Sequence, residues 1–282
     1  MAVRLANAKG RASLIVGEHL IDVERASDRR FAAEPMQVLA QWDAFAEWAA
    51  GIGAGAATGA LQPEELGPCV PRPTKVFGIG LNYRSHAAEG GLPLPKQPLV
   101  FTKFPNCLSG PRADVPLSSS KYVDWEVELV VVLGRRAYKV DEARVSDHLA
   151  GYCVGQDISD RKLQFSDQPP QFSMGKSLDG FGPIGPAVVS LDALRDANDL
   201  QLTCDVAGER MQDARSSDMV FSVAQLVSYL SRFCTLEPGD LIFTGTPAGV
   251  GSVRTPRRYL AAGEEIVSTI EDVGTLINRC VA

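Results

Sequence analysis

The chain has 282 residues, of which 45% are hydrophobic, and carries a formal net charge of −6 at pH 7. This length and composition permit one large hydrophobic core, or a principal domain with a smaller one beside it, and exclude a disordered chain. Lysine and arginine form no concentrated stripe, so the sequence gives no electrostatic footprint for nucleic acid or for an anionic membrane surface. Small-molecule chemistry is therefore the expected class of function.

The beginning of the chain predicts a cytoplasmic protein. Residues 1–10 lack the apolar core of a signal peptide, and no apolar run is long enough to cross a bilayer. The six cysteines lie far apart, without the paired spacing of a zinc or redox motif. We interpret them mostly as reduced thiols of the core.

Residues 1–70 are predicted to form a small N-terminal domain. Apolar residues on both sides of Gly17-Glu18 indicate a short hairpin, and a helix is expected to begin near Pro35. The apolar side of this helix consists of Val38, Leu39, Trp42, Phe45 and Trp48. The stretch 51–57, rich in glycine and alanine, interrupts the pattern and is interpreted as a linker.

Residues 71–282 are predicted to form a second, mainly β domain of the α+β class. Short apolar segments alternate with turn signals, and strands are expected at 75–79, 99–103, 122–133, 151–156, 186–190, 200–206, 241–244, 265–270 and 275–281. The clearest helix covers 223–233, where Ser222 and Gln225 have the spacing of a capping box. So few helices argue against a sheet built from βαβ units.

Two glycine-rich segments do not match nucleotide-binding motifs. Gly78-Ile79-Gly80 follows a strand, but Tyr83 stands where a dinucleotide fingerprint needs its third glycine. Segment 244–251 lacks the Gly-Lys-Ser/Thr ending of a phosphate loop. It is interpreted as a tight turn after a strand, or as a place where the backbone approaches a ligand closely.

Glu126 and Glu128 are the most informative residues of the sequence. They alternate with Trp125, Val127 and Leu129 in a run otherwise built for burial, so they share one face of a strand. Two carboxylates in a poorly solvated place must be protonated, matched by cations or bound to a hard divalent ion. The alternative is an edge strand whose acidic side chains face water.

His86 is a candidate general base. Glu89 follows it at the i+3 position, so the two side chains share one side of a helical turn, and a carboxylate there orients the imidazole and stabilises its cation. Gly90-Gly91 gives the segment hinges that suit a lid. A solvated ion pair is the alternative.

Two further residues are ambiguous by themselves. Asp157 ends a predicted strand, where it either joins a site or caps a helix beginning near Ser159. Lys176 lies among glycines, prolines and aromatic residues and is either a surface lysine or a cation aimed at developing negative charge.

Together these residues resemble the fumarylacetoacetate hydrolase family, in its acylpyruvate hydrolase-like branch. The resemblance runs from about residue 75 to the C-terminus through five ordered segments: 82–89, 124–129, 156–164, 176–186 and 237–247. It departs from the family pattern at Gln156, where relatives commonly carry Asn, and at Asp160, which replaces a small residue. The first seventy residues match only loosely.

The resemblance implies a mixed β-sandwich roll with a small variable N-terminal domain. It further implies that Glu126, Glu128 and Asp157 hold Mg²⁺ or Mn²⁺, with Ca²⁺ as a substitute in crystals. His86 and Glu89 would activate water, with Lys176 as a third catalytic residue. The substrate would contact Tyr83, Arg161, Gln164 and Thr246.

The activity implied is hydrolysis of a carbon–carbon bond in an acylpyruvate-like 1,3-diketo acid through a metal-stabilised pyruvate enolate. Decarboxylation of a β-keto acid such as oxaloacetate, and isomerase or hydratase chemistry on oxo-dioic acids of aromatic catabolism, remain alternatives because one fold hosts many reactions. A non-catalytic binding protein is a further alternative. The family also implies a homodimer.

Overall fold

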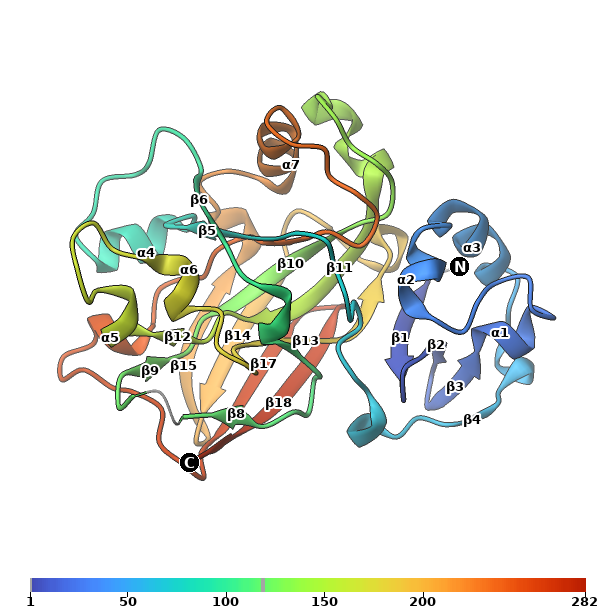
Figure 1. Ribbon diagram of the computed structural model, residues 1–282, viewed down its shortest axis with the longest axis horizontal. Coiled ribbons are helices and arrows are strands. Elements are labelled where there is room, and N and C mark those ends of the chain that lie inside the picture. Colours follow the sequence, from blue (N-terminus) through green and yellow to red (C-terminus); the bar gives the residue numbers. More distant parts are fainter. Residues whose placement is uncertain (1, 118–119) are drawn as a thin grey trace.

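The computed structural model describes residues 2–117 and 120–282, which form two main β-sheets (Figure 1). The larger is an 11-stranded sheet with the order β4-β3-β2-β1-β13-β11-β10-β16-β5-β6, in which β7 pairs with β13 outside this path. Its strands are β1 Arg4–Ala8, β2 Arg11–Val16, β3 His19–Asp22, β4 Gly59–Ala60, β5 Val76–Gly80, β6 Leu99–Thr102, β7 Leu108–Ser109, β10 Val127–Leu133, β11 Leu149–Gln156, β13 Gly182–Val189 and β16 Leu241–Phe243.

The smaller sheet has five strands in the order β15-β14-β17-β18-β8. They are β8 Val115–Pro116, β14 Gln201–Val206, β15 Glu209–Arg215, β17 Glu265–Ile270 and β18 Gly274–Val281. Strands β9 Val123–Asp124 and β12 Ser159–Asp160 form a separate antiparallel pair. Strands β10, β11 and β13 pack against β14, β17 and β18, so the two main sheets face each other.

The helices are short and lie outside the sheets. The α-helices are α1 Val23–Ala26, α2 Pro35–Leu39, α3 Trp42–Ala49, α4 Arg84–Glu89, α5 Arg161–Gln164, α6 Phe172–Gly175 and α7 Val223–Ser231. The 3₁₀ turns are η1 Ala54–Ala56, η2 Pro63–Glu65, η3 Pro105–Cys107, η4 Glu142–His148, η5 Leu191–Ala193, η6 Ser216–Asp218 and η7 Gly251–Val253. No helix in the described part of the chain is long and apolar enough to cross a bilayer.

Strand β10 is buried on both faces. Leu129 and Val131 belong to the core between the two sheets. Val130 and Val132 point the other way into a second core, which includes Phe31 and other residues of the N-terminal region. The strand is also central, because β11 and β16 pair with its two edges. The alternative of a water-facing edge strand is therefore wrong for Glu128, and both glutamates are buried.

The N-terminal region continues the large sheet through pairing of β1 with β13. The predicted hairpin is present as β2 and β3, whereas the helix expected from Pro35 is two helices, because the chain turns at Ala40 and Gln41. That turn still allows Val38 and Phe45 to be buried in the same core. The domain boundary at residue 70 stays a prediction.

Most predicted strands are present, and the mainly β α+β class is confirmed. Helix α7 begins with the expected capping box between Ser222 and Gln225. The expected strand 122–133 is instead two strands, β9 and β10, separated at Trp125 and Glu126. All six cysteines are free thiols, and all but Cys234 are buried, as expected.

Candidate functional site

Three carboxylates meet at one end of strands β10 and β11. Antiparallel pairing sets Val127 opposite Gln156, and the amide of Asp157 donates to the carbonyl of Glu126 at 2.9 Å. One oxygen from each of Glu126, Glu128 and Asp157 lies within 4.8 Å of the others, and all three residues are buried. The structure thus brings together the acidic residues that were singled out in the sequence.

Two glutamine side chains accept hydrogen bonds from the backbone amides at the break between β9 and β10. The side-chain oxygen of Gln156 accepts from the amide of Glu126 at 2.9 Å, and its nitrogen donates to Ser268 at 2.9 Å. Gln212 accepts from the amide of Val127 at 3.0 Å. These two glutamines satisfy the backbone where the ladder is interrupted, so the departure at Gln156 supports the local path of the chain.

Asp157 does not cap a helix. That alternative is wrong because Asp160 is the residue at the N-cap of α5, accepting from the amides of Lys162 and Leu163. Asp157 instead accepts from two ammonium groups, Lys103 at 2.7 Å and Lys176 at 2.7 Å. A fully buried aspartate needs such partners to remain charged.

Three buried cations surround the carboxylates. Lys176 donates to Glu126, Asp157 and Ser159, each at 2.7 Å. Arg161 donates to Glu126 at 2.6 Å through one terminal nitrogen, to Gln164 at 3.0 Å through the other, and to Asp124 at 2.8 Å through Nε. Both residues line the cavity, but in this arrangement their donors are directed to protein acceptors. Their substrate-related roles stay predictions.

Lys103 was missed by the sequence reasoning, although it ends a predicted strand. Its ammonium also donates to the carbonyls of Phe181, at 3.1 Å, and Lys176. Burial opposes its charge, but the neighbouring Asp157 outweighs burial and raises the pKa of Lys103. A lysine directly after the apolar segment 99–102 is the only signal that the sequence offers for it.

The surroundings shift the pKa values of Glu126 and Glu128 in opposite directions. Burial works to raise the pKa of Glu126, but Lys176 and Arg161 reverse this and lower it. For Glu128, burial together with the nearby charges of Asp157 and Glu126 raises the pKa well above its ordinary range. Within the described residues Glu128 has no ion pair, and its one hydrogen bond comes from the amide of Gly245 at 2.8 Å.

The three carboxylates fit a divalent metal ion. All donors are carboxylate oxygens, which hard cations such as Mg²⁺ and Mn²⁺ prefer. Glu128 also lacks a cation of its own, which an ion bound between the three side chains would supply. The buried triad is therefore consistent with a divalent metal centre held by Glu126, Glu128 and Asp157.

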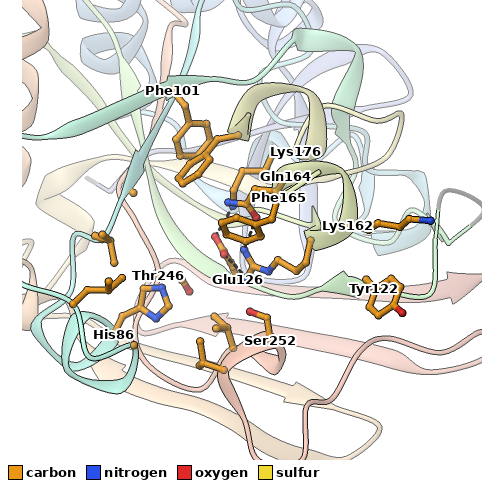
Figure 2. A pocket seen from close by; sticks show the side chains of 18 of the residues that line it. His86, Phe101, Tyr122, Glu126, Lys162, Gln164, Phe165, Lys176, Thr246 and Ser252 are labelled. Atoms are coloured by element: carbon orange, nitrogen blue, oxygen red, sulfur yellow. Dashed lines mark hydrogen bonds and ion pairs between the residues drawn. The ribbon is translucent and has the colours of Figure 1, made fainter. Parts of the chain in front are cut away.

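His86 lies on α4, across the cavity from the carboxylates (Figure 2). Its Nδ1 is 3.5 Å from Oε2 of Glu89, which is a loose contact, and this nitrogen has no hydrogen bond within the described chain. Burial works to raise the pKa of Glu89, but His86 and the amide of Gly249 outweigh burial and lower it. The predicted pair is adjacent, with the carboxylate charged.

Helix α4 is anchored at both ends. The amide and hydroxyl of Ser85 donate to Asp218 at 3.0 and 2.6 Å, and Glu89 accepts from the amide of Gly249 at 3.0 Å. Gly91, with φ +63°, then leads into an exposed loop that contains Leu92. Lid movement of this segment stays a prediction.

The glycine-rich turn after β16 directs its amides at the acidic residues. The amide of Gly245 donates to Glu128, the amide of Gly249 donates to Glu89, and the amide of Gly251 donates to Asp124 at 2.7 Å. At Gly245, φ is +100° and an added Cβ would lie 2.8 Å from Asn82 Cβ, so this position requires glycine. The close backbone approach expected here is made to side chains of the site.

Of the predicted substrate contacts, Thr246 lies at the cavity surface and Tyr83 does not. Thr246 lines the cavity, but its hydroxyl donates to the carbonyl of Val127 at 2.9 Å and accepts from Gln212 at 2.8 Å. Tyr83 is fully buried behind the lining, and its hydroxyl has no hydrogen-bond partner among the described residues. Burial, with Glu128 and Asp218 nearby, raises the pKa of Tyr83 well above its ordinary value.

The site opens into a cavity of about 820 Å³. Glu126, Glu128, Lys176 and Thr246 line it, and Phe101 and Phe165 lie over one side of Glu126 (Figure 2). Tyr122 and Lys162 lie at the side away from His86 (Figure 2). A polar, charged floor under aromatic walls suits a small polar substrate with an apolar or extended tail.

Comparisons with known proteins identify the family of this chain. The family model described as fumarylacetoacetate (FAA) hydrolase C-terminal matches residues 75–281. A mitochondrial oxaloacetate tautomerase of Bos taurus is 42% identical over 213 residues, covering 75% of this chain and 68% of that protein. The crystal structure of "a putative HpcE protein" from Mycobacterium smegmatis has a TM-score of 0.93 and 45% identity, and covers 99% of both chains.

A third similar protein was crystallised with a metal ion. Fumarylpyruvate hydrolase from Pseudomonas aeruginosa, in complex with Mn²⁺ and pyruvate, has a TM-score of 0.67 and 32% identity, over 74% of this chain and 90% of that one. Because the family model matches well over half of the chain and covers every residue of the site, the protein belongs to the fumarylacetoacetate hydrolase family.

Proposed function

We propose that this enzyme hydrolyses a carbon–carbon bond in acylpyruvate-like 1,3-diketo acids with the help of Mg²⁺ or Mn²⁺. The observation that carries the proposal is the arrangement of a buried carboxylate triad facing a histidine–glutamate pair across one cavity. The fumarylpyruvate hydrolase with bound Mn²⁺ and pyruvate supports it, because that substrate is itself an acylpyruvate.

When bound by Glu126, Glu128 and Asp157, a divalent ion supplies a Lewis acid that polarises the 2-oxo acid end of the substrate. His86 supplies the base. Its Nδ1 faces Glu89, which leaves Nε2 to take a proton from a water molecule. The hydroxide adds to the distal carbonyl, the carbon–carbon bond to the pyruvate unit breaks, and the acyl group leaves as a carboxylic acid. The carbanion takes the proton back from the imidazolium of His86 to give pyruvate.

Glu89 and Lys176 have supporting roles in this proposal. The charged Glu89 stabilises the imidazolium that forms when His86 accepts the proton. Lys176 fixes Glu126 and Asp157 in position and keeps a positive charge beside the leaving group. Arg161 orients Glu126 from the other side.

Replacing His86 tests the proposal. His86→Ala is expected to abolish hydrolysis of acetylpyruvate, measured as pyruvate release, while leaving the affinity for Mn²⁺ nearly unchanged. His19→Ala is the matched control, because His19 is an exposed histidine of β3, far from the cavity lining. An equal loss of hydrolysis and metal affinity in His86→Ala would refute the role of this residue as the base.

Oxaloacetate chemistry is the second candidate, because the tautomerase of Bos taurus is 42% identical. Enolisation and tautomerisation need a base and an electrophile, and decarboxylation needs only an electrophile that stabilises the enolate. None of these reactions needs an attacking water. Three readouts separate the reactions: acetate with pyruvate from acetylpyruvate indicates hydrolysis, pyruvate with carbon dioxide from oxaloacetate indicates decarboxylation, and loss of enol absorbance without pyruvate indicates tautomerisation. Isomerisation of dioic oxo acids, a reaction of aromatic catabolism, is followed by the same absorbance measurement.

We further propose a cytoplasmic homodimer. Edge strand β6 exposes Leu99 and Val100, and Phe104 and Met174 expose further apolar surface nearby. An exposed apolar edge of this kind is suited to a contact with a second copy. Light scattering coupled to size exclusion determines the mass in solution, and a monomer at all concentrations would contradict this part of the proposal.

A further inference from the structure

Glu89 depends on one backbone amide for its position. Within residues 2–117 and 120–282, its carboxylate accepts hydrogen bonds only from the amide of Gly249, at 3.1 and 3.0 Å. Its contact with Nδ1 of His86 is looser, at 3.5 Å. A carboxylate that orients a general base works well only when its own direction is fixed. Whatever fixes Gly249 therefore also fixes the proposed pair of Glu89 and His86.

Gly249 is held from its carbonyl side by two donors. The indole nitrogen of Trp125 donates to this carbonyl at 3.2 Å, and Nε of Arg254 donates to it at 3.4 Å. A terminal nitrogen of Arg254 also donates to the carbonyl of Met211, at 3.0 Å. The guanidinium group thus bridges strand β15, which contains Met211, and the turn that contains Gly249.

The backbone at Gly249 has little room to move. Its φ is +107°, and an added Cβ would lie 2.0 Å from the carbonyl oxygen of Met211. A positive φ is strained for residues with a side chain, and this contact leaves no space for one. Strand β15 is therefore packed closely against the turn at the point where Arg254 joins them. A displacement there would move the Gly249 amide away from the carboxylate that it binds.

Arg254 has no carboxylate of its own. In the described part of the chain, no aspartate or glutamate oxygen lies within 4.0 Å of its guanidinium group, and both of its side-chain acceptors are main-chain carbonyls. Burial works to raise the pKa of Glu89. The charge of Arg254 opposes this and, together with His86 and the Gly249 amide, lowers it. Arg254 is thus a cation that acts on Glu89 without an ion pair between them.

We propose that Arg254 is a positioning residue, which holds the turn at Gly249 so that Glu89 stays directed at His86. The inference rests on the proposed function, because that function makes Glu89 the partner of the base. Arg254 does not line the cavity, although Ser252 does, so its effect on the reaction passes through Glu89 and not through contact with the substrate.

A double-mutant cycle tests whether Arg254 acts through Glu89. The assay is pyruvate release from acetylpyruvate with Mn²⁺ present. Arg254→Gln should lower kcat about 10–100-fold, the loss expected when a catalytic group is misdirected, with KM and the affinity for Mn²⁺ nearly unchanged. In the Glu89→Ala background the same change should cost less than about twofold, because the group that it positions is already gone. Losses that multiply would overturn the proposal.

Hydrogen exchange in α4 tests the same contact without turnover. The amides of Ala87 and Gly90 form hydrogen bonds inside this helical segment, so their exchange rates report how often it opens. With Mn²⁺ present, Arg254→Gln should speed the exchange of both amides as much as Glu89→Ala does. Unchanged protection in Arg254→Gln would also overturn the proposal.

Two further variants distinguish positioning from a general loss of structure. The side chain of Arg4, on β1, also donates to two main-chain carbonyls, those of Asp272 and Val273, and does not line the cavity. Arg4→Gln should leave kcat and the exchange in α4 unchanged, and a loss equal to that in Arg254→Gln would count against positioning. Arg254→Lys keeps the charge but cannot bridge both carbonyls with the same geometry, so it should recover only part of kcat.

The proposed hydrolase activity fails separately, when the wild-type protein releases no pyruvate from acetylpyruvate. The exchange measurement then decides by itself whether Arg254 holds Glu89, since it reports the position of α4 and not the reaction. Faster exchange in both Arg254→Gln and Glu89→Ala would still support the positioning role.

Discussion

Asp124 offers the sharpest test of how the site is held together. It is completely buried, and all four of its hydrogen-bond partners are donors. Its Oδ1 accepts from the amides of Trp125 at 2.9 Å and Gly251 at 2.7 Å, and its Oδ2 accepts from Arg161 Nε at 2.8 Å and the amide of Ser252 at 3.0 Å. Asp124→Ala removes every one of these acceptors at once.

The expected loss follows from these contacts. Removing one partner of a buried ion pair costs about 3–5 kcal/mol, because the remaining charge and the amides lose their acceptors. Arg161 keeps its bond to Glu126, so the cost should stay within this range. For a chain of this size we expect the unfolding midpoint to fall by about 6–15 °C. Asp124→Asn should also destabilise, since its amide nitrogen would face donors on one side.

Thermal unfolding followed by circular dichroism measures the effect, and Asp43→Ala is the control. Asp43 also pairs with an arginine, Arg135, at 2.6 Å, but their side chains are 56% and 49% exposed. An exposed pair of this kind contributes about 0–1 kcal/mol. If Asp124→Ala and Asp43→Ala shift the midpoint equally, the reasoning from burial is wrong.

Three further predictions concern the charge cluster and the turn after β16. The raised pKa of Glu128 means that the folded, metal-free protein binds a proton more tightly than the unfolded chain, so its stability should fall as the pH rises above the ordinary value of 4.5. Mn²⁺ should restore the lost stability. In unfolding scans between about pH 5 and pH 8, Glu128→Gln should flatten the pH dependence. Lys103→Met should destabilise by about 3–5 kcal/mol and weaken Mn²⁺ binding measured by calorimetry, because Asp157 loses its Oδ1 partner; unchanged affinity would show that Lys103 does not position Asp157. Gly251→Ala should cost about 3 kcal/mol or more in chemical denaturation, since its Cβ would lie 1.8 Å from the carbonyl oxygen of Arg258, whereas Gly53→Ala meets nothing within 4 Å and should be nearly neutral.

The sequence predicted the features that depend on local patterns. Alternating apolar residues located β10 and its buried acidic face, and Ser222 with Gln225 located the start of α7. Strand β15 was missed because most of its residues are charged or polar, and its pairing with β14 is what makes it a strand. The break of the predicted helix at Ala40 was also missed, since both halves bury the same apolar side.

The candidate site was predictable in its acidic residues and less so in its cations. Glu126, Glu128 and Asp157 stand out because carboxylates are rare in segments built for burial. The engagement of Lys176 and Arg161 by these carboxylates, and the burial of Lys103 and Asp124, arise from contacts between residues that are distant in sequence. Such contacts leave no periodic signal, so only the folded arrangement reveals them.

The turn after β16 connects α4 to the buried acidic residues through hydrogen bonds. The same short segment holds Glu128 through Gly245, Glu89 through Gly249 and Asp124 through Gly251. An outward swing of α4 that carries Glu89 away must therefore free the Gly249 amide, between two glycines anchored to the acidic floor. If α4 moves when substrate enters, the same turn would also affect how fast a bound metal ion leaves. A variant that slows substrate entry should then also slow metal dissociation.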